Sequence, residues 1–167
     1  MFQDQSKDIV RDLGYLTLGS RLKRLGERLQ SNTQRILDEH GLDVQAAQTV
    51  FLNAIERSGS LTVGELAESV GVSQPGATRT VGDLEDAGYV EIVQSSGDQR
   101  RKSVTLTLNG RRLVEHGRSK VWPLVERAVR DVCEELRGPL LTQLAAIEDA
   151  LTDKPLNQRI TKQGRRS

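Results

Sequence analysis

The sequence predicts a mainly α-helical fold with one small β-hairpin, and three observations lead to this class. Apolar residues recur at spacings of three and four through most of the chain, which is the period of an amphipathic helix. Two segments rich in β-branched residues, 89–94 and 102–108, flank a loop of small and charged residues. Only 3% of the 167 residues are aromatic, so the core must be aliphatic. The length fits one domain spanning residues 1–167.

Composition and cysteine usage exclude several classes of protein. The fractions of hydrophobic (36%) and charged (28%) residues are typical of a soluble globular chain. The single cysteine, Cys133, excludes an intrachain disulfide, and the only histidines, His40 and His116, lie far apart, so we expect no metal and no cofactor. No apolar run approaches the ~20 residues of a membrane span, and the N-terminus lacks a signal-peptide core, which predicts a cytoplasmic protein. The net charge of +1 favours no partner.

Two helices are expected before residue 60. Residues 8–39 predict one long helix that ends just before Gly41. Its apolar stripe is Leu18, Leu22, Leu25, Leu29 and Ile36. Asp43 is the expected N-cap of a second helix over 44–57. The apolar face of that helix is Ala47, Val50, Phe51, Ala54 and Ile55.

A compact helix–glycine–helix unit follows at 62–87. Thr62 and Glu65 have the capping-box spacing at the start of a helix over 63–69, and Gly71 turns the chain. Ser73 caps a fourth helix, which tolerates Pro75 in its first turn. The expected inner face and end of this helix are Ala77, Val81, Leu84 and Gly88. The pattern is typical of a helix-turn-helix that places its second helix in the DNA major groove, and it is also compatible with an ordinary αα-hairpin.

Two further helices are expected after the hairpin, over 109–137 and from Leu140 to about Leu151, followed by a basic, flexible tail over 153–167. Pro123, next to Trp122, predicts a kink in the first of them. The apolar positions are Val121, Leu124, Val125, Ala128, Val132 and Leu136 in one helix and Leu140, Leu144, Ile147 and Leu151 in the other. These stripes and that of 8–39 exceed what one small domain covers, which predicts a homodimer.

The hairpin changes the interpretation of the helix–glycine–helix unit, because the two together make a winged helix. Its tip carries Arg100, Arg101 and Lys102, which can reach DNA phosphates or a minor groove. Between residues 60 and 108, however, four basic residues stand against seven acidic ones, a net charge of −3. A winged helix that docks onto protein therefore remains the alternative. We expect no enzyme, because no carboxylate pair, nucleophile–histidine arrangement or phosphate-binding glycine loop is present.

The residues from 42 to 110 resemble the multiple antibiotic resistance regulator (MarR) family of bacterial transcription factors. The segment 73–88, beginning SQPGATRTVGDLE, is similar to the recognition-helix pattern of the family. The matching positions are Ser73, Thr78, Arg79, Val81, Leu84, Glu85 and Gly88. The hairpin contains D-x-R at 98–100 and L-T-x-x-G at 106–110, at the spacing of the family. The first helix and the two terminal helices also occupy the places that the family gives them.

The resemblance implies a dimeric, sequence-specific DNA-binding regulator, expected to be a repressor of a palindromic operator. It implies a winged region over 42–108 and helical dimerisation regions over 8–40 and 109–152. The DNA-binding residues carried over to this chain are Ser73, Gln74, Gly76, Thr78 and Arg79 in the recognition helix and Asp98, Arg100, Arg101 and Lys102 in the wing. Arg100 would enter the minor groove, oriented by Asp98.

The resemblance also implies release from DNA by a small aromatic or anionic effector, although no motif in the sequence marks its pocket. Residues 12–25 resemble, more loosely, a branch of the family in which some members carry a fused acetyltransferase. We expect no acetyl-transfer activity from this chain.

Overall fold

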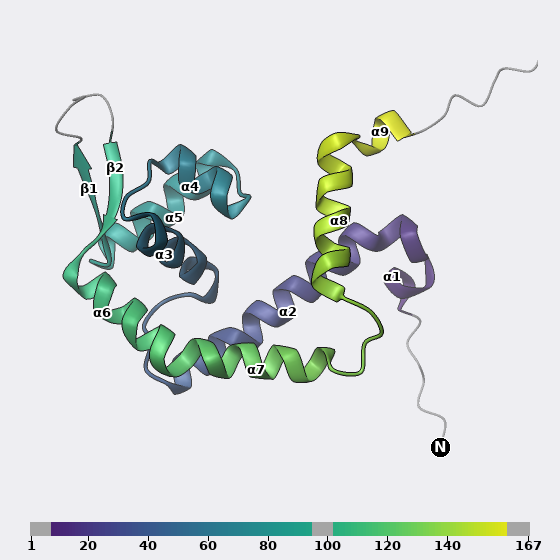
Figure 1. The fold of residues 1–167 in the computed structure, drawn as a ribbon, viewed down its shortest axis with the longest axis horizontal. Coiled ribbons are helices and arrows are strands. Elements are labelled where there is room, and N and C mark those ends of the chain that lie inside the picture. The colour runs from purple at the N-terminus through teal and green to yellow at the C-terminus, as the bar shows by residue number, and fades with distance from the viewer. Residues whose placement is uncertain (1–7, 95–101, 160–167) are drawn as a thin grey trace, which may run out of the picture. The chain divides into compact units, whose positions relative to one another are not determined.

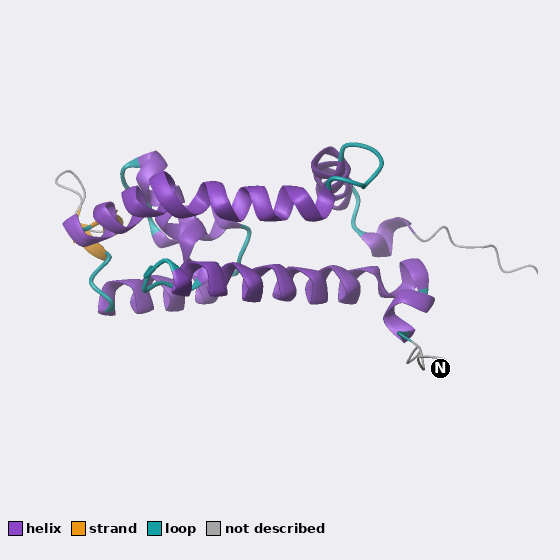
Figure 2. Ribbon diagram, turned by 90° about the horizontal axis from the view of Figure 1, so that it is seen from below, coloured by secondary structure: helices purple, strands orange, loops and turns teal. Residues whose placement is uncertain are grey.

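The structure is a computed structural model that describes residues 8–94 and 102–159 (Figure 1). The chain divides into two compact units, 1–129 and 130–167. The elements of the first are α1 (Ile9–Asp12), the 3-10 helix η1 (Gly14–Thr17), α2 (Leu18–Glu39), α3 (Ala46–Ser58), α4 (Val63–Val70), α5 (Gln74–Asp86), β1 (Val90–Gln94), β2 (Lys102–Leu106), α6 (Leu108–His116), the π-helix η2 (Gly117–Val121) and α7 (Trp122–Cys133), which continues into the second unit. The second also contains α8 (Leu140–Asp153) and α9 (Leu156–Arg159). Helices dominate (Figure 2), which confirms the predicted fold class.

The hydrophobic core lies in the first unit and is aliphatic, as the composition requires. Its fully buried side chains come from α2 to β2, α6 and η2: Leu37, Leu52, Ile55, Leu66, Val81, Leu84, Val90, Val104, Val114 and Val121. In contrast, α8 contains no buried residue. No described helix is both long and apolar enough to cross a membrane.

The single long helix predicted over 8–39 is wrong, because the chain turns at Leu13–Thr17. Gly14 takes a positive φ of 55°, which ends α1, and η1 leads into α2. The turn folds α1 back along α2. Arg24 donates to both carboxylate oxygens of Asp8, at 2.9 and 2.8 Å, and the Thr17 hydroxyl donates to the Val10 carbonyl at 2.7 Å.

The start and the buried face of α3 also differ from the prediction. Gln45, not Asp43, is the N-cap, with the Gln48 side chain reaching back to the Gln45 N–H at 3.1 Å. The Gln34 side chain on α2 accepts from the Ala46 N–H at 2.7 Å, so a distant residue satisfies this helix end. The buried residues are Phe51, Leu52 and Ile55, whereas Ala47 and Val50 are exposed.

The helix–glycine–helix unit matches the prediction in its caps. The Thr62 side chain accepts from the Glu65 N–H, and the Glu65 carboxylate accepts from the Thr62 N–H at 2.8 Å. Gly71 ends α4 in the left-handed conformation with φ of 74°, and the Val72 N–H bonds back to the Ala67 carbonyl at 3.0 Å. Leu66 and Ala67 are buried as expected, whereas Val70 is only half-buried.

The hairpin pairs β1 with β2 in antiparallel register, from Val90 opposite Leu106 to Gln94 opposite Lys102. Leu61 forms a short bridge to Val104, so the segment between α3 and α4 extends the small sheet on its β2 side. The second predicted strand, over 102–108, is too long by two residues, because Thr107 caps α6.

The continuous helix predicted over 109–137 is wrong as well. A π-helical turn interrupts it at Gly117–Val121, and α7 ends at Cys133. The Trp122 indole lies on Gly117, where a Cβ would be 2.3 Å from the ring. Pro123 cannot donate a backbone hydrogen bond to the preceding turn. These two residues explain why the irregular turn lies here, directly before the position predicted to kink.

Candidate nucleic-acid interface

The second helix of the helix-turn-helix, α5, has one face in the core and one face free. Ala77, Val81 and Leu84 are buried, as the sequence predicted. Ser73 caps the helix by accepting from the Gly76 N–H at 3.3 Å, and Pro75 stands in the first turn. The exposed N-terminus of this helix therefore offers the positive end of the helix dipole, which favours an anion.

The five residues that the sequence assigned to this helix are all exposed: Ser73, Gln74, Gly76, Thr78 and Arg79. Within the described part of the chain, no hydrogen bond engages the Gln74 side chain and no ion pair engages Arg79. At 3.6 residues per turn, Arg79 lies opposite the buried Ala77 and Val81. Amide and guanidinium groups with unused donors, held on a rigid helix, can bond base edges or phosphates.

The C-terminal half of α5 is negatively charged. Asp83 and Asp86 line, with Arg79, an open hollow of about 800 Å³ beside the end of α2. Tyr89 also lines this hollow, and its hydroxyl donates to the Asp43 carbonyl at 2.9 Å. Burial, and then the Asp43 charge, raise the pKa of Tyr89 above its usual value, so the hydroxyl stays a donor at neutral pH. Cationic character is thus confined to the first half of the helix.

The base of the hairpin is fixed to the end of α5 by the L-T-x-x-G segment. The Thr107 hydroxyl donates to the Gly88 carbonyl at 2.7 Å and accepts from the Gly110 N–H at 3.0 Å. A Cβ on Gly110 would lie 2.0 Å from the Tyr89 carbonyl oxygen, so only glycine fits. The sequence pointed to these residues only as a family pattern. In the structure they set the direction in which the wing leaves α5.

Of the wing residues that the sequence singled out, only Lys102 lies in the described part, exposed at the first position of β2. Asp98, Arg100 and Arg101 lie outside the described residues. Their position relative to α5 therefore stays a prediction.

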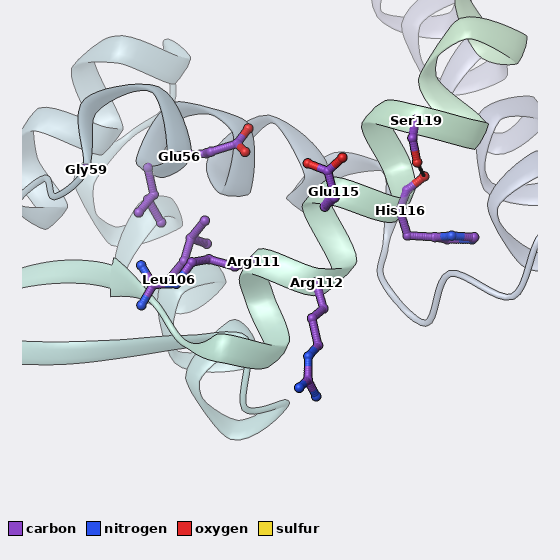
Figure 3. Close-up of a pocket in the computed structure, with 9 residues that line it drawn as sticks. Glu56, Gly59, Leu106, Arg111, Arg112, Glu115, His116 and Ser119 are labelled. Carbon is purple, nitrogen blue, oxygen red and sulfur yellow. Dashed lines mark hydrogen bonds between the residues drawn. The ribbon is translucent and has the colours of Figure 1, made fainter.

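Two further hollows surround the winged region. The hollow in Figure 3, about 640 Å³, lies between the end of α3 and α6, over Ile55 and Leu106. Glu56 and Glu115 face it, and Arg118 binds both, at 3.3 Å from Glu56. Because mixed charges surround its apolar floor, it defines no ligand chemistry.

The second hollow, about 830 Å³, lies between α2, α3, α4 and α5 and reaches Gly76 and Thr80 of α5. No sequence motif marks it, because its lining comes from four separate elements. Among the described residues, no group of three or more metal-ligating side chains could hold a metal ion.

Known DNA-binding regulators resemble this chain in sequence. Residues 40–101 match the sequence profile of the MarR family. The chain is 30% identical over 128 residues to the HTH-type transcriptional regulator FarR of Neisseria gonorrhoeae, covering 75% of this chain and 86% of FarR. The chain belongs to the MarR family. It spans only about half of two other curated relatives, 55% and 53% of their lengths.

Solved structures agree on the fold of this MarR-family chain. A mutant of MarR from E. coli complexed with operator DNA aligns with a TM-score of 0.57 at 26% identity, covering 80% of this chain and 92% of MarR. BpsR of Bordetella bronchiseptica, solved in connection with regulation of its DNA binding by 6-hydroxynicotinic acid, aligns with a TM-score of 0.64 at 21% identity, covering 81% and 92%. The relatives are transcriptional regulators, and no enzymatic domain is indicated.

Proposed function

We propose that this chain is a dimeric, sequence-specific DNA-binding repressor that reads a palindromic operator. The observation that carries the proposal is the exposure of Gln74, Thr78 and Arg79 on α5, a helix anchored by three buried side chains. The operator-bound MarR structure, which shares the fold, supports DNA as the partner. A helix held in this way meets the geometric need of major-groove recognition.

Each residue of the α5 face has a chemical role in this proposal. Gln74 pairs with an adenine edge, and Arg79 pairs with a guanine edge or a phosphate. Ser73, at the positive end of the helix, bonds a phosphate, and Gly76 lets the backbone come close. In the wing, Arg100 enters the minor groove with Asp98 orienting it, while Arg101 and Lys102 contact phosphates.

The proposal of a dimer rests on apolar side chains that the described chain leaves uncovered. On α2, Leu22, Leu25 and Leu29 are 39%, 52% and 36% exposed. In the second unit, Val132 is 72% and Ile147 41% exposed. A second copy that buries these stripes against its own makes a symmetric interface. Two-fold symmetry then sets half-sites about one helical turn apart, ~34–36 Å.

Repression and its release are the regulatory part of the proposal. A dimer seated on an operator excludes other proteins from that DNA, and a small aromatic or anionic molecule releases it. The hollow of about 830 Å³ reaches Gly76 and Thr80, so a ligand bound in it would contact the recognition helix. The regulation of BpsR by 6-hydroxynicotinic acid supports the chemical class.

The experiment is selection from a randomised duplex pool, read by sequencing, with sedimentation of the free protein. We expect enrichment of a palindrome whose half-sites lie about ten base pairs apart. A retained pool without any sequence preference, at low salt, contradicts sequence-specific binding.

A winged helix that docks onto protein is the second candidate. The net charge of −3 between residues 60 and 108, together with Asp83 and Asp86 on α5, favours it. It predicts that Arg79 and Arg100 are dispensable and that DNA binding is weak and unselective.

A further inference from the structure

The Thr78 hydroxyl on α5 is already used as a donor. Its Oγ1 donates to the Gln74 carbonyl one turn earlier, at 2.9 Å, although the side chain is exposed. A hydroxyl carries a single hydrogen, so what Thr78 presents outward is an acceptor lone pair and its methyl group.

The surroundings of Thr78 leave this short side chain accessible. The next position on the same side of the helix is Gly82, one turn further on, and a Cβ there would meet no atom within 4 Å. Glycine is a poor helix former, and no packing in the described chain calls for it at this position. With no side chain at Gly82, the helix backbone can approach a surface closely enough for threonine to reach it.

We propose that Thr78 is a specificity-determining residue that selects against guanine at the base it faces. In the major groove guanine presents only acceptors, N7 and O6, whereas adenine and cytosine present an amino donor and thymine a methyl group. An acceptor lone pair repels guanine and accepts from an amino group, and the threonine methyl packs on the thymine methyl. The inference rests on the proposed function, because it needs α5 in the major groove.

The test is a panel of duplexes carrying every single base-pair change in the selected operator, measured with three variants. Thr78→Val keeps the shape and removes the hydroxyl, so we expect discrimination against guanine to fall roughly five- to tenfold at one base pair per half-site. Thr78→Ser keeps the hydroxyl, so it should still reject guanine while losing the preference for thymine. Thr152→Val on α8 is the matched control, because the exposed Thr152 hydroxyl makes the same bond to the carbonyl one turn earlier, at 3.1 Å, outside the winged region; it should leave the profile unchanged.

Two results would overturn the inference. If the base preferences of Thr78→Val stay within about twofold of the wild type at every position, Thr78 takes no part in base recognition. An equal loss on all duplexes would make it a positioning contact. If instead the wild type itself shows no preference for any sequence, the proposed function fails, and this outcome is distinct because no variant is needed to see it.

Discussion

The backbone of Gly110 lies directly against the carbonyl of Tyr89, so the first turn of α6 touches the chain that leaves α5. A Cβ on Gly110 would lie 2.0 Å from the Tyr89 oxygen and 2.9 Å from its carbon. Both neighbours are backbone atoms, which cannot rotate away. The wing and the recognition helix therefore share one rigid junction.

Gly110→Ala is expected to destabilise the protein by about 1–3 kcal/mol, because the added methyl forces this junction apart. Urea unfolding measures the loss. Gly64→Ala is the matched control: a Cβ at Gly64 meets nothing within 4 Å, so its unfolding midpoint should stay the same or rise. Coincident unfolding curves for Gly110→Ala and the wild type would refute the close approach.

Acid should loosen α1 from α2. Hydrogen bonds from Arg24 hold the pKa of Asp8 below its ordinary value of 3.8, since they favour the carboxylate. The ion pair therefore contributes fully above 3.8 and is lost as the pH falls through the lower, folded-state pKa. The protection factors of the α1 amides, which take account of the slower intrinsic exchange in acid, should fall there, and in Asp8→Asn they should be low at every pH.

Glu27→Gln is the control for that experiment, because it breaks only the exposed Lys23–Glu27 contact within α2. Exchange in α1 that does not change between Asp8→Asn and the wild type would show that the Arg24 contact does not hold α1.

Asp83→Asn and Asp86→Asn are expected to tighten binding to random duplex DNA severalfold at low salt, because each removes a negative charge from the helix that the proposal places in the major groove. The gain should shrink as salt rises. Anisotropy titrations at several salt concentrations measure it. Glu148→Gln on α8 removes an equal charge outside the winged region and should change little. No gain for either α5 variant would mean that this half of the helix stays away from DNA.

Gln74→Ala should cost about 1–3 kcal/mol on the selected operator and little on random DNA, since it removes contacts to a base edge. Its thermal stability should match the wild type, because no described residue bonds to the Gln74 side chain. Binding to both duplexes is compared at one salt concentration. Equal losses on the operator and on random DNA would mean that Gln74 positions the protein on DNA and does not read a base.

Arg100→Ala should weaken DNA binding and make the dependence of log affinity on log salt shallower by up to ~0.9, because a cation in the minor groove displaces counterions as a phosphate contact does. Sedimentation should show an unchanged dimer. An unaltered salt slope would remove the wing tip from the interface.

The parts of the fold that follow from the sequence are those set by local chemistry. Thr62, Glu65 and Ser73 cap their helices as predicted, because a cap depends on residues only three apart. The start of α3 was missed because Gln34, twelve residues away, satisfies the Ala46 N–H. The π-helical turn was missed because it depends on the Trp122 ring meeting Gly117.

Part of the candidate interface also follows from the sequence, and part of it is seen only in the structure. On α5, helix periodicity and the buried Ala77, Val81 and Leu84 place Arg79 on the free side. Gln74 has the spacing of the buried residues and is exposed because it lies at the helix N-terminus. The engaged hydroxyl of Thr78 and the clamp of Thr107 on the Gly88 carbonyl depend on atomic distances that no spacing encodes. These contacts are therefore structural findings.

The most direct test of sequence-specific dimeric binding compares the selected operator with a scrambled duplex of equal length at one salt concentration. Anisotropy gives both affinities, and sedimentation of the complex gives its stoichiometry. We expect two chains per operator and an affinity at least ~10³-fold above that for the scrambled duplex. Equal affinity for the two duplexes, or one chain per operator, would contradict the account.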